Sequence, residues 1–187
     1  MEARLEVSTS YSTVSFAGNP GFVGKLDQHG SLHPDVNLSL FRRVCTTFEL
    51  TSIQDLNLAG AGIGPKAAKI LLDALWASKK LRKSIKTLDV SANPIVPHET
   101  DREFAAWAVL CSMLVTMMLE HQCIINLGSI GMGPRAALEL ATVLKAKSIE
   151  DLRDCEGSSF AMFGNLIGDA ALEAVSASVD WGLKKCP

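Results

Sequence analysis

A sixteen-residue phrase occurs twice in this sequence, once in residues 56–71 and again in residues 125–140. The copies begin 69 residues apart, and the identical pairs are Asn57/Asn126, Leu58/Leu127, Gly62/Gly131, Gly64/Gly133, Pro65/Pro134, Ala67/Ala136, Ala68/Ala137 and Leu71/Leu140. A unit that recurs within one chain is typical of architectures in which similar supersecondary units stack and share a core. The sequence therefore constrains the fold before it indicates a function.

Fainter copies share one pattern of apolar positions, followed by Asn or a small residue and then by Gly or Pro. The registers are Leu56/Leu58/Ala61/Ile63, Leu88/Val90/Asn93/Ile95, Ile125/Leu127/Ile130/Met132 and Phe160/Met162/Asn165/Ile167, with an earlier one at Val14/Phe16/Asn19. Their steps are 42, 32, 37 and 35 residues. Alternation over three to five residues predicts a short strand with one buried face, and the Asn amide suits a turn that ends it.

A helix is expected after each turn. Pro65 and Pro134 suit a first helical turn, where a missing N–H costs nothing. Asp35 is expected to cap a helix over residues 35–48, and another helix should begin near Gly168 and Asp169. Helical spacing predicts core faces at Ala68, Leu71, Leu72 and Leu75, at Ala137, Leu140, Ala141 and Leu144, at Val36, Leu40, Val44 and Phe48, and at Leu172, Val175 and Val179.

The pattern L-x-L-x-x-N-x-I-G-x-x-A-A-x-x-L resembles the leucine-rich repeat family, in the long α/β subtype of ribonuclease inhibitor, NOD-like receptors, tropomodulin and the Ran GTPase-activating protein. The resemblance implies an α/β fold, a short solenoid (horseshoe) with parallel inner strands and outer helices. Residues 1–50 are expected to form an N-terminal segment with a divergent repeat and a capping helix. Residues 51–187 are expected to hold the repeats, with an irregular last one in which residues 148–154 resemble a displaced strand start.

Composition bounds the function. The net charge of −2 gives no indication of nucleic-acid binding, and Lys79, Lys80, Arg82, Lys83 and Lys86 are interpreted as a solvated helix end rather than a phosphate site. Five scattered cysteines and no recognisable signal segment favour reduced thiols in an intracellular, cytoplasmic or cytoskeletal setting. The uncharged stretch 104–119 is shorter than the roughly twenty residues of a membrane span and predicts a buried helix.

Chemistry-bearing motifs are weak. The segment Gly60–Gly64 follows a strand and opens a helix, which is the context of a dinucleotide-binding loop with Asp89 as the ribose partner. A similar glycine set recurs at Gly128, Gly131 and Gly133, which favours structural glycines at repeat turns. His29 and His33 are spaced as a possible metal pair in a loop, without a second pair. We expect no catalytic site, cofactor or metal.

Two binding surfaces are expected. Strand residues pointing away from the core should form a concave row, with Asp55, Asn57, Asp89, Asn126 and Phe163 as the protein-binding candidates. That row is small and polar, so it either contacts a partner through close approach or is solvated. The second surface is on the helix expected over residues 104–119. Its core stripe is formed by Phe104, Trp107, Cys111, Leu114 and Met118, and a second apolar face is formed by Ala106, Leu110, Met113 and Met117. Either other parts of the chain or a partner protein should cover that second face.

The sequence therefore favours a non-catalytic protein–protein interaction scaffold or a structural subunit of a larger hetero-complex, with one or more protein partners. One alternative is a regulator, activating or inhibiting an enzyme such as a small GTPase through the concave face. A nucleotide-binding enzyme that uses Gly60–Gly64 is the other alternative.

Overall fold

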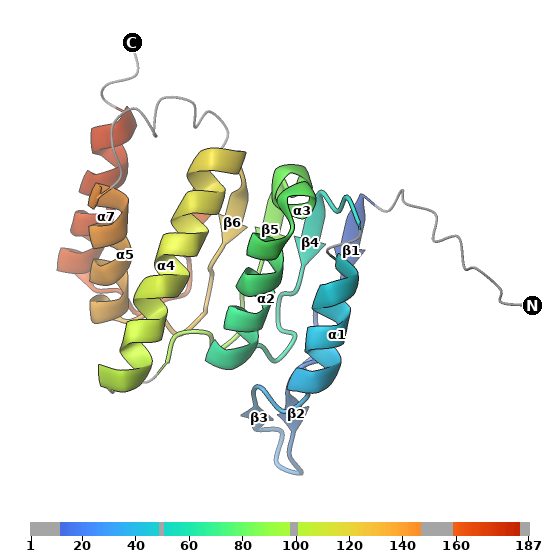
Figure 1. Ribbon diagram of the computed structural model, residues 1–187. Coiled ribbons are helices and arrows are strands. Elements are labelled where there is room, and N and C mark those ends of the chain that lie inside the picture. The colour runs from blue at the N-terminus through green and yellow to red at the C-terminus, as the bar shows by residue number, and fades with distance from the viewer. Residues whose placement is uncertain (1–11, 49–50, 98–100, 147–158, 184–187) are drawn as a thin grey trace, which may run out of the picture.

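Five short parallel strands form one sheet, and helices cover one of its faces (Figure 1). The computed structural model describes residues 12–48, 51–97, 101–146 and 159–183. The strands lie in chain order and are β1 (Thr13–Ser15), β4 (Asp55–Asn57), β5 (Thr87–Asp89), β6 (Ile124–Asn126) and β7 (Ser159–Ala161). The predicted mixed α/β class with a parallel sheet is confirmed.

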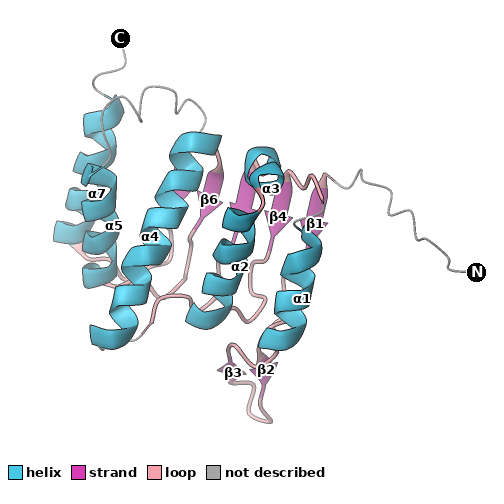
Figure 2. Cartoon of the chain, viewed as in Figure 1, coloured by secondary structure: helices cyan, strands magenta, loops and turns pink. Residues whose placement is uncertain are grey.

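The helices follow the strands in the alternation that a parallel sheet requires (Figure 2). They are α1 (Leu38–Phe48), α2 (Pro65–Ala77), the short α3 (Lys79–Ser84), α4 (Asp101–His121), α5 (Pro134–Ala146) and α7 (Asp169–Leu183). A two-stranded antiparallel hairpin, β2 (Lys25–Leu26) with β3 (Leu32–His33), lies between β1 and α1 in the chain. The displaced strand start expected at residues 148–154 lies outside the described residues.

The registers read from the sequence coincide with the strand pairing. Val14 pairs with Leu56, Leu56 with Leu88, Leu88 with Ile125, and Ile125 with Phe160. The three central registers are buried throughout, with exposed fractions of 4% or less at every one of their positions. These side chains lie between the sheet and the helices in one continuous core. The same positions in the last register are more exposed, because no following unit covers them among the described residues.

Two helix predictions are wrong in detail. Helix α1 begins at Leu38 instead of Asp35, and it buries Phe41, Cys45 and Phe48, whereas Val36 and Leu40 are about half exposed. Leu172 of α7 is also half exposed. Both errors occur at the ends of the stack, because an apolar position becomes core only where a neighbouring helix lies beside it.

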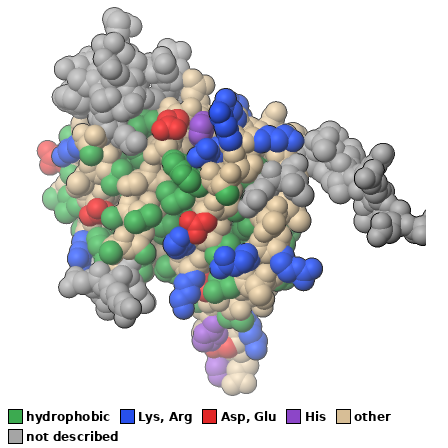
Figure 3. Space-filling view, in the orientation of Figure 1, with side chains coloured by type: hydrophobic (Ala, Val, Ile, Leu, Met, Phe, Trp, Pro, Cys, Tyr) green, Lys and Arg blue, Asp and Glu red, His purple; other side chains and the backbone are tan. Residues whose placement is uncertain are grey.

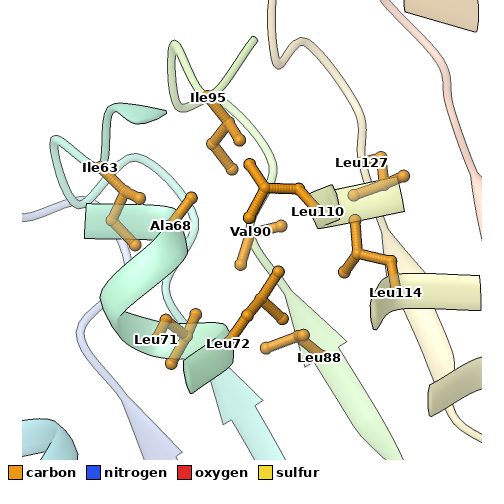
Figure 4. A pocket seen from close by; sticks show the side chains of 10 residues that line it. All are labelled: Ile63, Ala68, Leu71, Leu72, Leu88, Val90, Ile95, Leu110, Leu114 and Leu127. Atoms are coloured by element: carbon orange, nitrogen blue, oxygen red, sulfur yellow. The ribbon is translucent and has the colours of Figure 1, made fainter. Parts of the chain in front are cut away.

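Helix α4 is apolar on several sides because it has neighbours on several sides. It contacts α2, α3, α5 and β6, and Leu110 and Leu114 point toward α2 and the strands (Figure 4). The space between them is a wholly apolar cavity of about 20 Å³. On length and composition alone, residues Phe104–His121 could cross a membrane, but 56% of that stretch is buried inside the protein. Packing within the chain accounts for the apolar character of α4.

Candidate interaction surfaces

The polar row predicted on the open face of the sheet is present as a register. Asn57 pairs with Asp89, and Asp89 pairs with Asn126, while Asp55 lies two residues before Asn57 on the same face. Three side chains in the row accept a hydrogen bond from the backbone N–H two residues later: Asn57 from Ala59 at 3.0 Å, Asp89 from Ser91 at 2.9 Å, and Asn126 from Gly128 at 3.0 Å. The row therefore turns the chain at the end of each strand.

Further hydrogen bonds tie the row together across the strands. The Asn126 amide donates to the Asp89 carboxylate at 3.0 Å, and Thr13 donates to Asp55 at 3.2 Å. The side chains of Asp55, Asn57, Asp89 and Asn126 are half-buried, so much of their hydrogen-bonding capacity serves the fold. Phe163 differs from them, because its ring is 65% exposed and lies directly against Gly128, where a Cβ atom would come within 2.7 Å of the ring. It is the one bulky apolar anchor among the five predicted residues.

Two asparagines, Asn93 buried and Asn165 half-buried, join successive units through hydrogen bonds. Asn93 is 1% exposed and accepts from the N–H of Ile63 at 3.0 Å while donating to the carbonyl of Leu58 at 2.8 Å, both in the preceding unit. Asn165 does the same with Ile130 at 3.0 Å and Leu127 at 2.7 Å. The sequence predicted these asparagines as turn residues within their own unit. Their bonds to the preceding unit depend on the stacking, which the sequence does not display.

The second apolar face predicted on α4 is not one surface. Leu110 and Met117 are 2% and 1% exposed inside this chain, Met113 is half-buried, and Ala106 is exposed. The structure therefore does not bring the four residues together for a partner. Among the described side chains of α4, the large apolar one that reaches solvent is Val109, at 54% exposed. The core stripe predicted at Phe104, Trp107, Cys111, Leu114 and Met118 is buried, as expected.

The glycine segment at Gly60–Gly64 has its helix N-terminus already occupied by a carboxylate. Asp35 accepts from the backbone N–H groups of Gly64 at 2.8 Å, Lys66 at 2.9 Å and Ala67 at 3.0 Å. A Cβ atom at Gly62 would lie 2.4 Å from the carbonyl oxygen of Pro20. The backbone donors that would bind a pyrophosphate are therefore already bonded to Asp35. The prediction that Asp35 caps its own helix is wrong, since it caps α2.

The other ionisable groups are placed as follows. His33 lies 3.4 Å from the carboxylate of Asp27, and His29 contacts Gln28 in the hairpin; within the described ranges no three possible ligands gather for a metal ion. Cys45, Cys111 and Cys123 are buried and form no disulfide bond. Burial raises the pKa of the Cys123 thiol to about 12 and raises the pKa of Cys111 as well, so both stay protonated and unreactive at neutral pH.

A basic surface with an aromatic centre lies at the junction of α2 and α3. Trp76 is 41% exposed, and the guanidinium of Arg82 lies over its ring, 4.7 Å from the centroid. Lys79, Lys80 and Lys83 lie on α3, the same short helix as Arg82, and are exposed. We call Trp76, Lys79, Lys80, Arg82 and Lys83 the basic–aromatic patch. A cation over an exposed indole forms a flat, rigid contact surface, and Trp and Arg are the residues that most often dominate binding energy at interfaces.

Charge is unevenly distributed over the helix layer, with Lys and Arg gathered over the α1–α3 side (Figure 3). Helices α1, α2 and α3 carry eight basic residues (Arg42, Arg43, Lys66, Lys69, Lys79, Lys80, Arg82 and Lys83) and one acidic residue, Asp73. Asp73 is paired with Lys69 at 2.6 Å. The sequence showed the lysine run but not Trp76 beside it, because the α2–α3 turn places them together. The interpretation of the lysine run as a solvated helix end therefore did not include Trp76.

Comparison with known proteins identifies the fold and leaves the family open. Neither a protein-family model nor a curated protein sequence matches this chain. Among solved structures, the C-terminal domain of Caenorhabditis elegans tropomodulin superposes with a TM-score of 0.56 at 13% identity, covering 95% of this chain and 87% of that one. Actin-binding site 2 of leiomodin-1 superposes with a TM-score of 0.55 at 14% identity, covering 95% of this chain and 84% of that one.

These neighbours correct the resemblance drawn from the sequence. Tropomodulin is one of the proteins grouped in that resemblance, but the assignment to the ribonuclease-inhibitor-like leucine-rich repeat subtype is wrong. The similarity supports a mixed α/β domain with a parallel sheet, and the horseshoe solenoid is not shown. The repeated phrase specifies a strand, a turn and a helix, whereas the number and curvature of the units depend on packing between them.

Proposed function

We propose that this chain is a non-catalytic protein-interaction domain that binds an acidic protein surface through its basic–aromatic patch. The observation that supports this proposal is the exposed Trp76 ring, with the Arg82 guanidinium 4.7 Å from its centroid. Asp73, the one acidic residue of helices α1, α2 and α3, is already paired with Lys69. Such a surface attracts carboxylates at long range and holds them by stacking and charge-assisted hydrogen bonds at short range.

Protein is a better partner for this surface than nucleic acid. The whole chain has a net charge of −2, and the patch is compact rather than a long basic track. The solved neighbour that is named as an actin-binding site makes actin the first partner to test. Membership of a cytoskeletal hetero-complex inside the cell follows from that proposal.

The direct test is sedimentation of the purified chain with actin filaments. We expect the wild-type protein to co-sediment, and Trp76→Ala with Arg82→Glu to reduce the bound fraction at least tenfold. Lys145→Glu is the matched control, because Lys145 is exposed on α5, outside the patch. Wild-type protein that stays in the supernatant rejects actin as the partner. Equal loss in the patch and control variants rejects the patch as the surface.

A broader comparison separates the interaction role from the choice of actin. Proteins captured from lysate are compared between the wild type, the patch variant and Lys145→Glu, with folding of each checked by circular dichroism. A partner set that the patch variant alone loses supports the interaction role whatever the actin result. Identical sets with all three proteins contradict the patch.

The second candidate is a regulator of an enzyme, such as a small GTPase, that docks on the open face of the sheet. It is favoured by two exposed apolar side chains, Ile124 at the start of β6 (43% exposed) and Phe163 in the turn after β7 (65% exposed). Under this alternative, Phe163→Ser should abolish partner binding, whereas the patch variant (Trp76→Ala with Arg82→Glu) should still bind the partner. The reverse result assigns binding to the patch.

A further inference from the structure

Each unit of the stack offers two backbone donors to the unit that follows it. The N–H groups of Phe16, Leu58, Val90 and Leu127 donate to the carbonyls of Asn57, Asp89, Asn126 and Ala161 at 2.8, 2.7, 3.1 and 2.7 Å. Those of Gly18, Gly60, Ala92 and Ser129 donate to Ala59, Ser91, Gly128 and Phe163 at 2.8, 2.9, 2.8 and 2.8 Å. All four junctions therefore use the same register and the same direction.

The last described unit has the same donors, and the described residues provide no acceptor for them. Met162 and Gly164 occupy the two donor positions, and no hydrogen bond joins their N–H groups to another described residue. Leu172 occupies the position of Ala68 and Ala137, which neighbouring helices bury to 5% and 0% exposure, yet Leu172 is 50% exposed. Leu166, in the turn before α7, is 88% exposed, and residues that include Met162, Ile167 and Leu172 line an open groove of about 430 Å³. We call this surface the tail edge.

The first unit has the complementary groups. By the common register, the carbonyls of Ser15 and Ala17 occupy the positions of Asn57 and Ala59, which accept from a preceding unit. Asn19 occupies the position of Asn93 and Asn165, which fasten onto a preceding unit. Its side chain is exposed, and the described part of the chain offers its amide no hydrogen bond. We call this surface the head edge.

The helices at the two edges also complement each other. Leu40 occupies the position in α1 that Ile70 occupies in α2. Ile70 is 8% exposed, whereas Leu40 is 48% exposed. Helix α1 has Arg42 and Arg43 and no acidic residue. Helix α7 has exposed Asp169 and Glu173, and its sequence contains no Lys or Arg. Apolar surface would therefore meet apolar surface, and opposite charges would flank it.

We propose that a second copy of this chain docks head to tail, with its head edge on the tail edge of the first. The N–H groups of Met162 and Gly164 donate to Ser15 and Ala17 of the second copy, the Asn19 amide of that copy fastens onto the turn after Met162, and Leu40 packs beside Leu172. The contact is heterologous, because it joins two different surfaces. Each pair of copies therefore still has one unoccupied head edge and one unoccupied tail edge, and assembly continues as concentration rises. This inference does not depend on the proposed function, because the basic–aromatic patch lies on neither edge.

The test is sedimentation velocity of the 187-residue chain across a hundredfold concentration range, with three variants. Leu172→Lys disables the tail, and Asn19→Ala combined with Leu40→Lys disables the head. Leu138→Lys is the matched control, because Leu138 is 47% exposed on α5 and lies on neither edge. The substituted residues are all exposed, and circular dichroism confirms folding.

We expect the wild type and Leu138→Lys to form dimers and larger species as concentration rises, and each edge variant alone to weaken association at least tenfold. Mixing the tail variant with the head variant should restore a species that stops at the dimer, because one intact head meets one intact tail. A monomeric wild type at the highest concentration overturns the proposal. So does a mixture that fails to pair, or a loss of association in Leu138→Lys as large as in the edge variants.

Discussion

The carboxylate of Asp35 caps helix α2, with its Oδ1 atom 2.8 Å from the amide nitrogen of Gly64. The two residues are 29 positions apart, and the same carboxylate also accepts from Lys66 and Ala67. Asp35 has a positive φ of 61°, a conformation that Asp and Asn tolerate better than other side chains with a Cβ. One residue thus joins the turn before α1 to the start of α2.

Replacing Asp35 should weaken the whole N-terminal half of the stack. We expect Asp35→Ala to lower the free energy of unfolding by about 1–3 kcal/mol, because three helix N–H groups lose their acceptor. Asp35→Asn should cost less, since one acceptor oxygen remains. Urea unfolding at pH 7 measures both, with Asp73→Asn as the control. Asp73 is exposed and makes only an i,i+4 pair, worth about 0.3–0.5 kcal/mol, and an equal effect there would contradict the cap.

Asn93 should be among the costliest polar residues to remove. Asn93→Ala leaves the Ile63 N–H and the carbonyl of Leu58 without a partner in the core, and we expect a loss of about 2–4 kcal/mol. Asn57→Ala is the comparison, because Asn57 is half-buried and caps one N–H, for an expected loss of about 1 kcal/mol. Denaturation midpoints show which variant loses more stability. A smaller loss of stability for Asn93→Ala than for Asn57→Ala would show that the structure around Asn93 rearranges to satisfy the two backbone groups.

Charges introduced on α4 should distinguish its buried side from its exposed side. Met117→Glu places a carboxylate at a position that is 1% exposed, and we expect a loss of at least about 3 kcal/mol or outright unfolding. Val109→Glu, at 54% exposed, should change stability by less than about 0.5 kcal/mol. Thermal unfolding followed by circular dichroism measures both. A stable Met117→Glu protein would mean that this side of α4 is open.

His121 should make stability fall in weak acid. Burial lowers its pKa below the ordinary 6.5, Arg82 and Lys83 lower it further, and Glu120 opposes them. Since the folded state resists protonation, the contribution to stability is complete above pH 6.5 and is lost as pH falls through the lower pKa of the folded state. His121→Gln should therefore flatten the decline in urea midpoint between pH 8 and pH 5. Gln28→Ala, in the exposed hairpin, is the control, and an unchanged slope for His121→Gln would contradict the assignment.

The buried thiols should be silent in the native state. In a variant that carries Cys155→Ser and Cys186→Ser, the remaining cysteines are Cys45, Cys111 and Cys123, all buried, with the pKa of Cys123 near 12. We expect no reaction with a disulfide reagent at pH 7.5 and full reaction of three thiols in denaturant. Fast labelling without denaturant would show that the core opens.

The sequence alone determined the repeating unit. Alternating apolar residues, a turn with Asn or Gly, and Pro at the start of a helix act over a few neighbouring residues. Leu56, Leu88 and Ile125 are therefore recognisable as buried strand centres from their local pattern, and all three are buried in the folded chain. The absence of a convincing catalytic motif was also a sequence inference, and it remains an expectation.

The tertiary structure decided everything that depends on what lies beside a unit. Leu40 and Leu172 have the spacing of core residues but are half exposed at the two ends of the stack, whereas Leu110 and Met117 were expected on an outer face and are buried between helices. Asp35 caps a helix that follows the one predicted for it, and Trp76 meets Arg82 across a turn. Burial and long-range hydrogen bonds depend on neighbours in space, and a local pattern specifies a residue's own unit without specifying which neighbour will cover it.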